Sequence, residues 1–477
     1  MKLTLAEIAM GCGARLEAPA STAGVGALIA QGYSIDSRTI GAGELFFAVR
    51  GERLDGHDFI PAAIEHGAVA AVVSASLVAV LPDAALNAPL LVVEDTLQAL
   101  HALAAHVRRH WGGRMVAITG SAGKTSTKDA IAAALSARLQ VLKSIGNLNN
   151  AYGLPLQLLR LEPEHEVAVI EMGMNHAGEI AQLARIAAPD WGVITNVGAA
   201  HIENFYDGRS GIARAKYELV EALSANGIAF LNCDDPYVGQ FGRDFGGKVV
   251  YFGAGPCADP QITEIRETTD PEAESPILEI DVLSEGLPFS MRLQMIGRHN
   301  ASNAVAALAV AREAGVPIEA AIAALEAIKA GDKRGQILTL SGSLAGVTII
   351  NDSYNSNPEA LQSMIQALAA RPAQRRILVA GEMLELGEYA PALHAASGKA
   401  AAEAGIDVIV GVRGNAEHLV QAASEAAHPG TQIVFLQDAD AASHWLRDNL
   451  KAGDVVLVKG SRGVRLERAI ETLKTSN

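Results

Sequence analysis

The sequence predicts an α/β protein of three domains, and three observations lead to that prediction. The chain has 477 residues, enough for two to four domains at roughly 100–200 residues each. Short apolar runs typical of strands alternate with helical patterns, as in parallel sheets. A glycine-rich loop near residue 120 stands between one such strand and a helical pattern. We predict a small α/β domain at 1–107, a central parallel-sheet domain at 108–330 and a doubly wound, Rossmann-like domain at 331–477.

In the first domain, the apolar run at 44–49 is bounded by turn residues and predicts a strand. The most apolar stretch of the chain, 68–81, is shorter than the ~18 residues that suggest a membrane span. It favours either two short buried strands or a strand and a helix. The segment 108–113, rich in arginine and glycine, predicts a linker to the second domain.

The second and third domains show the alternation of strands and helices most clearly. In the second domain, strands are predicted at 114–119, 167–170, 192–195 and 228–232, and helices at 177–188, 300–314 and about 318–330. In the third, strands are predicted at 377–380, 408–412, 432–435 and 455–459, with a last helix at 464–473. Strands separated by helices in this way are typical of a doubly wound sheet.

Composition restricts the classes of partner. Apolar residues make up 49% of the chain, so each domain has enough for a core. The net charge of −15 argues against bulk attraction to nucleic acid or to an anionic membrane. An anionic substrate is compatible with it, given a local nest of backbone N–H groups and a few cations. We expect no nucleic-acid partner and no membrane insertion.

Cysteine usage and the N-terminus predict the compartment. Cys12, Cys233 and Cys257 are far apart in the sequence and contain no CxxC pair, which suggests neither a disulfide framework nor a zinc site. Reduced, buried thiols in a cytoplasmic protein are the expectation. The N-terminus carries Glu7 early and lacks the apolar region of a signal peptide. We expect a cytoplasmic protein and, by default, a monomer.

The glycine-rich loop predicts a phosphate-binding site. It reads Thr-Gly-Ser-Ala-Gly-Lys-Thr at 119–125; glycines let backbone N–H groups face phosphate oxygens, and the helix N-terminus adds its positive end. Lys124 offers a charge to the β- and γ-phosphates, and the Thr125 hydroxyl offers a ligand to Mg²⁺. Ile118 replaces the first glycine of the standard pattern, so this is a shortened variant. The predicted nucleotide-binding residues here are Gly120, Ser121, Ala122, Gly123, Lys124, Thr125 and Ser126.

Two alternatives stand beside this interpretation. One is an ordinary glycine turn before a helix. The other is a nucleotide-dependent switch, although the Asn-Lys-x-Asp tetrapeptide typical of guanine specificity does not occur in the sequence. Guanine-nucleotide binding without metabolite-dependent turnover would favour the switch.

Six further blocks follow the loop. They are Gly-Asn-Leu-Asn-Asn at 146–150, Glu-Met-Gly-Met-Asn at 171–175, Asn-Val-Gly-Ala-Ala-His at 196–201, Ala-Lys-Tyr-Glu-Leu at 215–219, His-Asn-Ala-Ser-Asn-Ala at 299–304 and Asn-Asp-Ser-Tyr-Asn-Ser-Asn-Pro at 351–358. Each block alone is a weak signal. Together and in this order they resemble the Mur ligase family of bacterial cell-wall synthesis, over nearly the whole chain and all three domains.

The resemblance implies an ATP-dependent amide ligase whose central domain is similar to P-loop ATPases and whose metal is Mg²⁺. It implies UDP-N-acetylmuramoyl-tripeptide and D-alanyl-D-alanine as the other substrates, with the block at 351–358 indicating the acceptor. The tripeptide carboxylate would form an acyl phosphate, which the dipeptide amine would attack to give a UDP-N-acetylmuramoyl-pentapeptide. A mobile third domain closing over the site would keep water out.

The resemblance also assigns the metal and catalytic residues. Thr125, Glu171, His201 and Lys216 are expected to hold Mg²⁺, with Lys216 carbamylated by CO₂ into an anionic oxygen donor. Lys124, Lys216 and His201 are the expected catalytic residues. Glu171 also ends a predicted strand, where α/β sheets hold their ligands, and a carboxylate suits Mg²⁺. The alternative for Lys216 is a solvated lysine, and the alternative for His201 is a surface or satisfied histidine.

Four more residues are expected at the nucleotide. Asn300 and Asn303 lie three apart on one face of a predicted helix, and the matching asparagines of the family contact the nucleotide. An amide pair that packs helices together is the alternative. Arg334 and Asp352 of the third domain are expected to reach the nucleotide when the domains close. A plain linker cation is the alternative for Arg334.

In the first domain, the resemblance assigns Ser34, Asp36, Ser37 and Arg38 to the uridine diphosphate end of the substrate. An arginine fork binds two pyrophosphate oxygens at once. A turn held by Asp36 and Ser37 is the alternative. The related folate polyglutamylases are a second enzyme candidate, but they lack the uridine-binding first domain and usually carry Asp-x-x-His where this chain has Asp-Ser-Tyr-Asn at 352–355.

Overall fold

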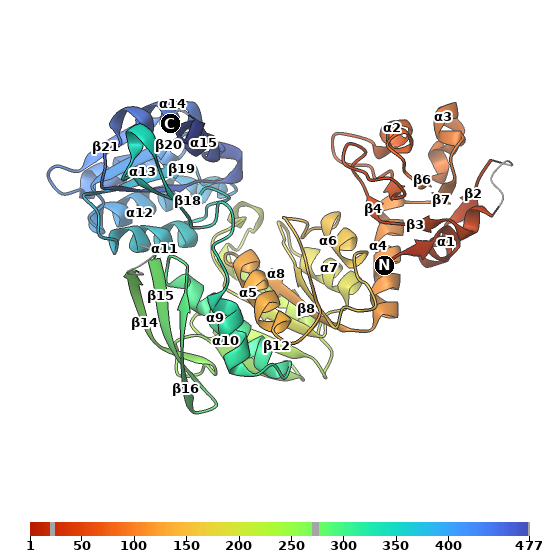
Figure 1. Ribbon diagram of the computed structural model, residues 1–477, viewed down its shortest axis with the longest axis horizontal. Helices are drawn as coiled ribbons and strands as arrows, with labels where there is room; N and C mark the ends of the chain where they lie inside the picture. Colours follow the sequence, from red (N-terminus) through yellow and green to blue (C-terminus); the bar gives the residue numbers. More distant parts are fainter. Residues whose placement is uncertain (20–23, 270–275, 476–477) are drawn as a thin grey trace.

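The computed structural model describes residues 1–19, 24–269 and 276–475. Figure 1 shows three domains, the first and the third at opposite ends of the molecule and the central one between them. Each domain is built on its own β-sheet with helices against it. The predicted α/β class with three domains is confirmed.

The first domain has a five-stranded sheet in the order β2-β7-β6-β5-β4. The strands are β2 Arg15–Glu17, β7 Leu90–Val93, β6 Ala70–Ser74, β5 Leu45–Phe47 and β4 Tyr33–Ser34. The edge strand β2 runs antiparallel to β7, and the other neighbours are parallel. The remaining elements include β1 Leu3–Thr4, β3 Ile29–Ala30, α1 Leu5–Cys12, α2 Ile60–Glu65 and α3 Asp83–Leu86. The apolar stretch 68–81 forms β6 and the 3-10 helix η3 Ala75–Val80, close to the predicted strand and helix.

A long helix, α4 Thr96–Trp111, joins the first domain to the central one. The predicted linker at 108–113 is therefore wrong for its first four residues, which form the last turn of α4. The polar sequence there has a structural reason: Arg108 is buried and donates to the Ala187 carbonyl and to Asp190, at 2.8 and 2.9 Å. Gly112 ends the helix in the left-handed conformation, with φ of +67°.

The central sheet has six parallel strands in the order β13-β12-β11-β8-β10-β9. They are β13 Lys248–Phe252, β12 Ile228–Asn232, β11 Trp191–Ile194, β8 Arg114–Thr119, β10 Val167–Glu171 and β9 Val141–Lys143. In β8, Val116 and Ile118 face the cluster that contains α5 Lys124–Ser136, α9 His299–Glu313 and α10 Ile318–Glu326. Met115 and Ala117 face the side of α4, α6 Gly153–Leu158, α7 Glu179–Ala187 and α8 Arg209–Glu221. Burial on both faces explains why these strands were predictable as apolar runs.

A three-stranded antiparallel sheet in the central domain was not predicted. It contains β14 Gln261–Thr269, β15 Pro276–Ser284 and β16 Leu287–Leu293 and lies beside α9 and α10. In β15 the buried Ile280 and Val282 alternate with more exposed residues, as expected for a sheet with one solvated face.

The third domain has a six-stranded sheet in the order β17-β18-β22-β19-β20-β21, which is parallel except for β17. Its strands are β17 Gln336–Thr339, β18 Thr348–Asp352, β22 Asp454–Lys459, β19 Arg375–Gly381, β20 Val408–Val412 and β21 Gln432–Leu436. One face carries α11 Pro358–Ala369, α12 Ala390–Glu403 and α13 Ala416–Ala426, and the other α14 Ala439–Asn449 and α15 Glu467–Thr475. This confirms the doubly wound prediction. Across the described ranges, no helix has both the length and the apolarity to cross a membrane.

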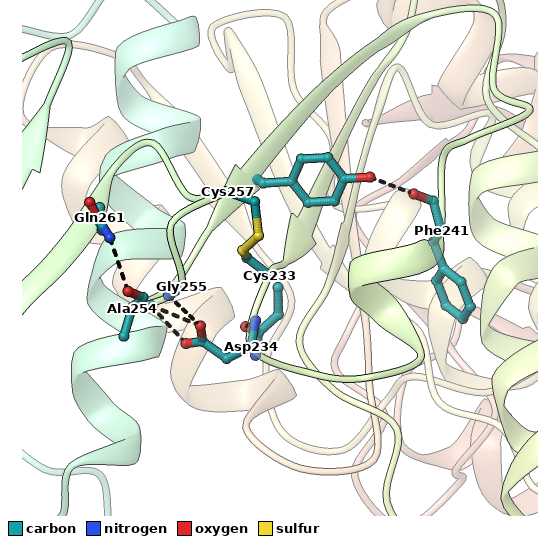
Figure 2. The surroundings of a disulfide bond; sticks show 9 residues. Cys233, Asp234, Phe241, Ala254, Gly255, Cys257 and Gln261 are labelled. Atoms are coloured by element: carbon teal, nitrogen blue, oxygen red, sulfur yellow. Dashed lines mark hydrogen bonds between the residues drawn. A yellow bond between two sulfur atoms is a disulfide. The ribbon is translucent and has the colours of Figure 1, made fainter.

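The cysteines differ from the expectation of reduced thiols. Cys233 and Cys257 form a disulfide with their Cα atoms 6.2 Å apart, whereas Cys12 is free (Figure 2). A separation of 24 residues in the chain gives no spacing signal. The fold brings the two together because β13 returns the chain alongside β12.

Candidate active site

A cavity of about 1030 Å³ lies between the central and third domains. The central domain contributes the glycine-rich loop, the ends of β10 and β11 and the start of α9, and the third domain contributes the segments around 352–363 and 459–463. Strands β10 and β11 flank β8, with Glu171 in register with Ile118 and Ile194 with Thr119. Their carboxyl ends therefore open at one sheet edge, the usual ligand site of such sheets.

The glycine-rich loop connects β8 to α5, as predicted, and Gly120 through Ser126 follow the strand end in order. Gly120 has a φ of +156°, and a Cβ there would overlap the Thr195 hydroxyl. Gly123 has a φ of +79°, and a Cβ there would lie 3.0 Å from the Asn303 Oδ1. Both glycines are thus required by backbone conformation and by close neighbours.

Lys124 begins α5 and lines the cavity. Its Nζ donates to the Gly120 carbonyl at 2.8 Å, across the loop. Burial lowers the pKa of Lys124; the Glu171 carboxylate opposes this effect, and the Arg334 charge adds to it. The loop thus carries a buried amine that a phosphate would stabilise in its charged form.

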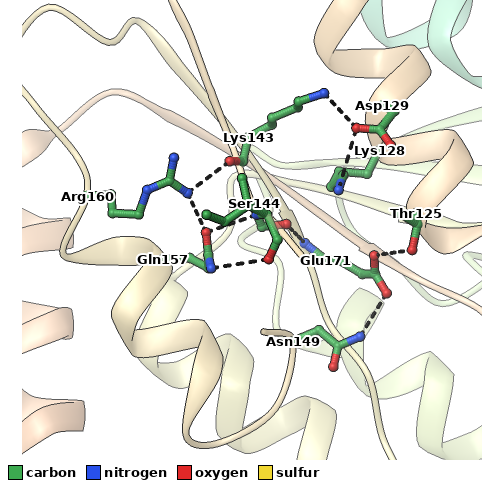
Figure 3. Close-up of polar contacts among 10 residues, drawn as sticks. Thr125, Lys128, Asp129, Lys143, Ser144, Asn149, Gln157, Arg160 and Glu171 are labelled. Carbon is green, nitrogen blue, oxygen red and sulfur yellow. Dashed lines mark hydrogen bonds and ion pairs between the residues drawn. The ribbon is translucent and has the colours of Figure 1, made fainter. Parts of the chain in front are cut away.

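Glu171 forms an oxygen-rich group with its neighbours (Figure 3). It is 4% exposed, the Thr125 hydroxyl donates to its Oε2 at 2.8 Å, and the Asn149 amide donates to its Oε1 at 2.8 Å. The Thr125 hydroxyl and the Glu171 carboxylate present oxygens of the kind that Mg²⁺ takes, whereas Asn149 presents its amide nitrogen. Within the described part of the chain, no group of three or more His, Cys, Asp or Glu side chains is placed to hold a metal. Thr125 and Glu171 fit a magnesium site at this edge that phosphate oxygens and water complete.

His201 lines the same cavity but already has a partner from the third domain. Its Nδ1 lies 2.6 Å from the Glu385 Oε2, and that contact lowers the pKa of Glu385. The backbone of His201 is left-handed, with a φ of +64°. The alternative of a histidine satisfied by a protein partner therefore fits this structure, in which His201 is a strained residue paired across a domain interface.

Lys216 lies on α8 and is 2% exposed, so the alternative of a solvated lysine is wrong. Burial and, second, the charge of Lys124 lower its pKa well below the usual range. Among the described residues, no ion pair includes Lys216, and no carboxylate contributes to the shift of its pKa. Lys216 is thus a buried amine without a counterion.

Asn300 and Asn303 line the cavity, and Asn303 also contacts helix α5. Asn303 accepts from the Thr127 hydroxyl at 2.9 Å and donates to the Asn300 Oδ1 at 3.0 Å. The helix-packing alternative is therefore present in the structure, and the pair also lines the cavity.

Arg334 and Asp352 reach the cavity from the third domain. The Arg334 guanidinium lies 4.0 Å from the centre of the Tyr354 ring, a cation–π contact. Asp352 forms an ion pair with Lys459 at 2.6 Å, and Lys459 also donates to the Asn355 carbonyl at 2.9 Å. Both residues therefore line the cavity, and Asp352 is held by a buried lysine.

The first-domain cluster does not line this cavity. Asp36 binds the Arg38 guanidinium in a bidentate pair at 2.9 and 2.7 Å and accepts from the Arg38 N–H at 3.0 Å. The Ser34 hydroxyl accepts from the Asp36 N–H at 3.0 Å, and the Ser37 carbonyl contacts His66. A turn exists here, but Ser34 and Asp36 hold it, not Asp36 and Ser37 as predicted. It leaves the Arg38 side chain 85% exposed.

Four residues that line the cavity were not predicted from the sequence: Asn149, Glu359, Glu385 and Lys459. Lys459 carried a usable signal, because it ends a predicted strand of a parallel sheet. Asn149 belongs to the block at 146–150, for which the sequence predicted no individual role. Glu359 and Glu385 contact the central domain across the interface, and no sequence pattern indicates such contacts.

Comparisons with known proteins agree with this arrangement. The Mur ligase middle domain matches residues 118–311, the Mur ligase glutamate ligase domain 333–462, and the catalytic domain of the Mur ligase family 30–108. The UDP-N-acetylmuramoyl-tripeptide–D-alanyl-D-alanine ligase of Escherichia coli (strain K12) is 36% identical, covering 92% of both chains. The ligase of that name from Bacillus subtilis (strain 168) is 31% identical, covering 93% of both.

Two solved structures are also similar. A crystal structure of MurF from Acinetobacter baumannii has a TM-score of 0.85 at 28% identity and covers 100% of this chain and 99% of that one. The MurF ligase from Thermotoga maritima in complex with ADP has a TM-score of 0.79 at 30% identity, covering 93% and 97%. With three matched domains in order along nearly the whole chain, this protein belongs to the Mur ligase family.

Proposed function

We propose that this chain is an ATP-dependent ligase that adds D-alanyl-D-alanine to UDP-N-acetylmuramoyl-tripeptide and so makes the pentapeptide precursor of peptidoglycan. The observation that carries the proposal is the similarity over 92% of both chains to an enzyme of that name. The geometry supports it, because a phosphate-binding loop faces a cavity between two domains.

ATP would bind with its phosphates on the loop. Backbone N–H groups and the N-terminus of α5 face the phosphate oxygens, and Lys124 offsets the charge that develops during phosphoryl transfer. Asn300 and Asn303 line the nucleotide side, and Arg334 adds a second cation from the third domain. Mg²⁺, when bound, supplies further charge neutralisation at the β- and γ-phosphates. Thr125, Glu171, His201 and Lys216 are the residues proposed to hold it.

The reaction then proceeds in two steps. The tripeptide carboxylate attacks the γ-phosphorus of ATP, so that an acyl phosphate forms and ADP leaves. The amine of the dipeptide attacks the acyl carbon, and phosphate leaves with the C–O bond electrons. The cavity wall from the third domain keeps water away from the acyl phosphate, which would otherwise hydrolyse.

Carbamylation of Lys216 removes an electrostatic conflict. Burial lowers the pKa of Lys216, and the nearby charge of Lys124 lowers it further, so an unmodified, charged Lys216 would be unfavourable here. CO₂ reacts with a neutral amine, and burial favours the neutral form of this amine. The carbamate that forms is an anion, which attracts Lys124 and offers oxygen to Mg²⁺.

The uridine diphosphate end is proposed to bind at the first domain, near Ser34, Asp36, Ser37 and Arg38. That cluster is outside the cavity, so the substrate would extend from the first domain with its peptide end at the phosphate loop. Helix α4 fixes the distance it has to span, because it packs against α1 in the first domain and α6 and α7 in the central one. We also propose that the protein is a monomer, since two domains of one chain together line the cavity. The proposed compartment is the cytoplasm.

Phosphate release with a panel of acceptors tests the proposal. Release with ATP, Mg²⁺ and UDP-N-acetylmuramoyl-tripeptide should require D-alanyl-D-alanine and be weak with D-alanine, L-alanyl-L-alanine or glutamate. Turnover with a single amino acid on a shorter UDP-muramoyl precursor, and none with the dipeptide, would assign the chain to another reaction of the family. GTP binding without acceptor-dependent turnover would favour the switch.

A further inference from the structure

The disulfide between Cys233 and Cys257 stands next to the nucleotide site. Cys233 directly follows Asn232, which ends β12 and lines the cavity. Cys257 lies on the connection between β13 and β14, and its side chain is exposed, whereas Cys233 is half-buried. Figure 2 shows the bond joining these two segments at the end of the sheet. Small thiols in solution therefore have access to it.

Hydrogen bonds connect the disulfide to the phosphate loop. The Asn232 amide donates to the Thr195 carbonyl at 2.8 Å, and the Thr195 hydroxyl donates to the Ala122 carbonyl in the loop at 2.7 Å. Thr195 is also the residue that a Cβ at Gly120 would overlap. Two hydrogen bonds thus link Asn232, the neighbour of Cys233, to the loop backbone that is proposed to bind phosphate. A movement of Cys233 can therefore reach that loop through Asn232 and Thr195.

A second connection runs to the loop that carries His201. The Asp235 carboxylate accepts from the Val197 N–H at 2.9 Å, and Val197 leads into the segment ending at His201. Asp234, between these residues, accepts from the Ala254 and Gly255 N–H groups at 2.8 and 2.7 Å (Figure 2). These bonds do not depend on the sulfurs, so we expect breaking the disulfide to loosen the segment without unfolding it.

We propose that Cys233–Cys257 is a reversible redox modification site that sets the affinity of the enzyme for nucleotide, with the oxidised form binding more tightly. A thiolate of a small dithiol attacks the exposed Cys257 sulfur, the S–S bond breaks, and Cys233 leaves as a thiolate that takes up a proton. The second thiol of the reagent then displaces Cys257 and becomes the oxidised dithiol, so two electrons pass to the protein. An accessible disulfide of this kind is the labile, regulatory type, which suits a reducing compartment.

The test begins with thiol counting and nucleotide affinity on the full chain. Alkylation of the denatured protein without reductant should modify one cysteine, Cys12, and after dithiothreitol it should modify three. The dissociation constant for ADP should rise about fivefold on reduction and return after re-oxidation. Three free thiols without reductant, or equal ADP affinity in both states, would overturn the inference and leave the proposed ligase function standing. No ADP binding in either state would overturn both.

Variants separate the pair from general thiol effects. Cys233→Ser and Cys257→Ser should each bind ADP like the reduced wild type, with or without dithiothreitol. Cys12→Ser is the matched control and should keep the full redox response, since burial raises the pKa of the Cys12 thiol to about 11 and it is far from the cavity. A redox response that persists in Cys233→Ser, or disappears in Cys12→Ser, would contradict the assignment. Should either serine variant fail to fold, reduction of the wild type still decides the question.

Discussion

The two lysines proposed for the mechanism, Lys124 and Lys216, differ in how well the sequence alone predicted them, and only Lys124 lines the cavity. Lys124 was predictable, because glycines and a following threonine place it at a strand–helix junction. Lys216 was identified only through a family block, and its own sequence surroundings are those of an ordinary helix lysine. Burial decides the difference: α8 turns Lys216 toward the sheet, where its amine has no counterion among the described residues.

The first prediction concerns Lys124. Lys124→Met should lower the rate of acceptor-dependent phosphate release by about a thousandfold, because it removes a preorganised charge at the transferring phosphoryl group. The matched control is Lys128→Met, one turn further along α5, where the lysine is also buried but pairs with Asp129 and does not line the cavity. Rates within a few-fold of each other for the two variants would remove Lys124 from the mechanism.

The second prediction concerns Lys216. Lys216→Ala should be nearly inactive, and added acetate should restore part of the activity, with chloride at equal ionic strength as the control. In wild type, ¹³C-bicarbonate should give a carbamate NMR signal that the variant lacks. Because the pKa of Lys216 is lowered, the amine is neutral above that pKa and protonates as the pH falls through it, so the signal should fade on acidification. A fully active, metal-loaded enzyme without a carbamate signal would count against carbamylation.

At the scale of elements, the strands buried on both faces were the most predictable. Each reads as a continuous apolar run, and the predicted ends agree with the structure within a few residues. The antiparallel sheet β14–β16 was missed although its alternation is visible in β15. The last turn of α4 was taken for a linker because its arginines and histidine look solvent-exposed, yet cations suit a helix C-terminus and Arg108 is buried against the central domain.

The third prediction concerns the turn between β4 and β5. Arg38→Ala should raise KM for the UDP-peptide about tenfold, since an arginine–pyrophosphate contact is a strong, bidentate interaction, and should leave KM for ATP unchanged. Arg15→Ala is the control: it removes an exposed arginine of the same domain that also pairs with a carboxylate, Glu17. A change in KM for ATP instead would show that the first domain does not hold the uridine diphosphate end.

At the scale of the molecule, the contacts between the central and third domains were beyond sequence reasoning. Their partners are up to 236 residues apart, as for the Asn357 amide and the Ser121 carbonyl at 3.3 Å. Which residues meet depends on how two separately folded domains are oriented, and no local pattern encodes that. Asp352 in the block at 351–358 was predicted to face the site, but the contact of Asn357 with the central domain was not predicted.

Glu359 makes two contacts across this interface, and the last prediction concerns it. It lies at the start of α11, and its Oε1 accepts from the Ala199 N–H at 3.0 Å and from the Arg209 guanidinium at 2.8 Å. Ala199 is two residues before His201, so the Glu359 carboxylate connects the third domain to the loop that carries His201, a proposed Mg²⁺ ligand.

The substitution Glu359→Gln keeps the shape of the side chain but removes its charge. It should lower the rate of phosphate release about tenfold, the effect of weakening one charge-assisted hydrogen bond. Glu403→Gln on α12, which loses an exposed pair with Lys399 inside the third domain, should behave as wild type. Combining Glu359→Gln with Arg209→Met should cost less than the sum of the two single changes; strictly additive effects would show that the two side chains do not act together in holding the domains.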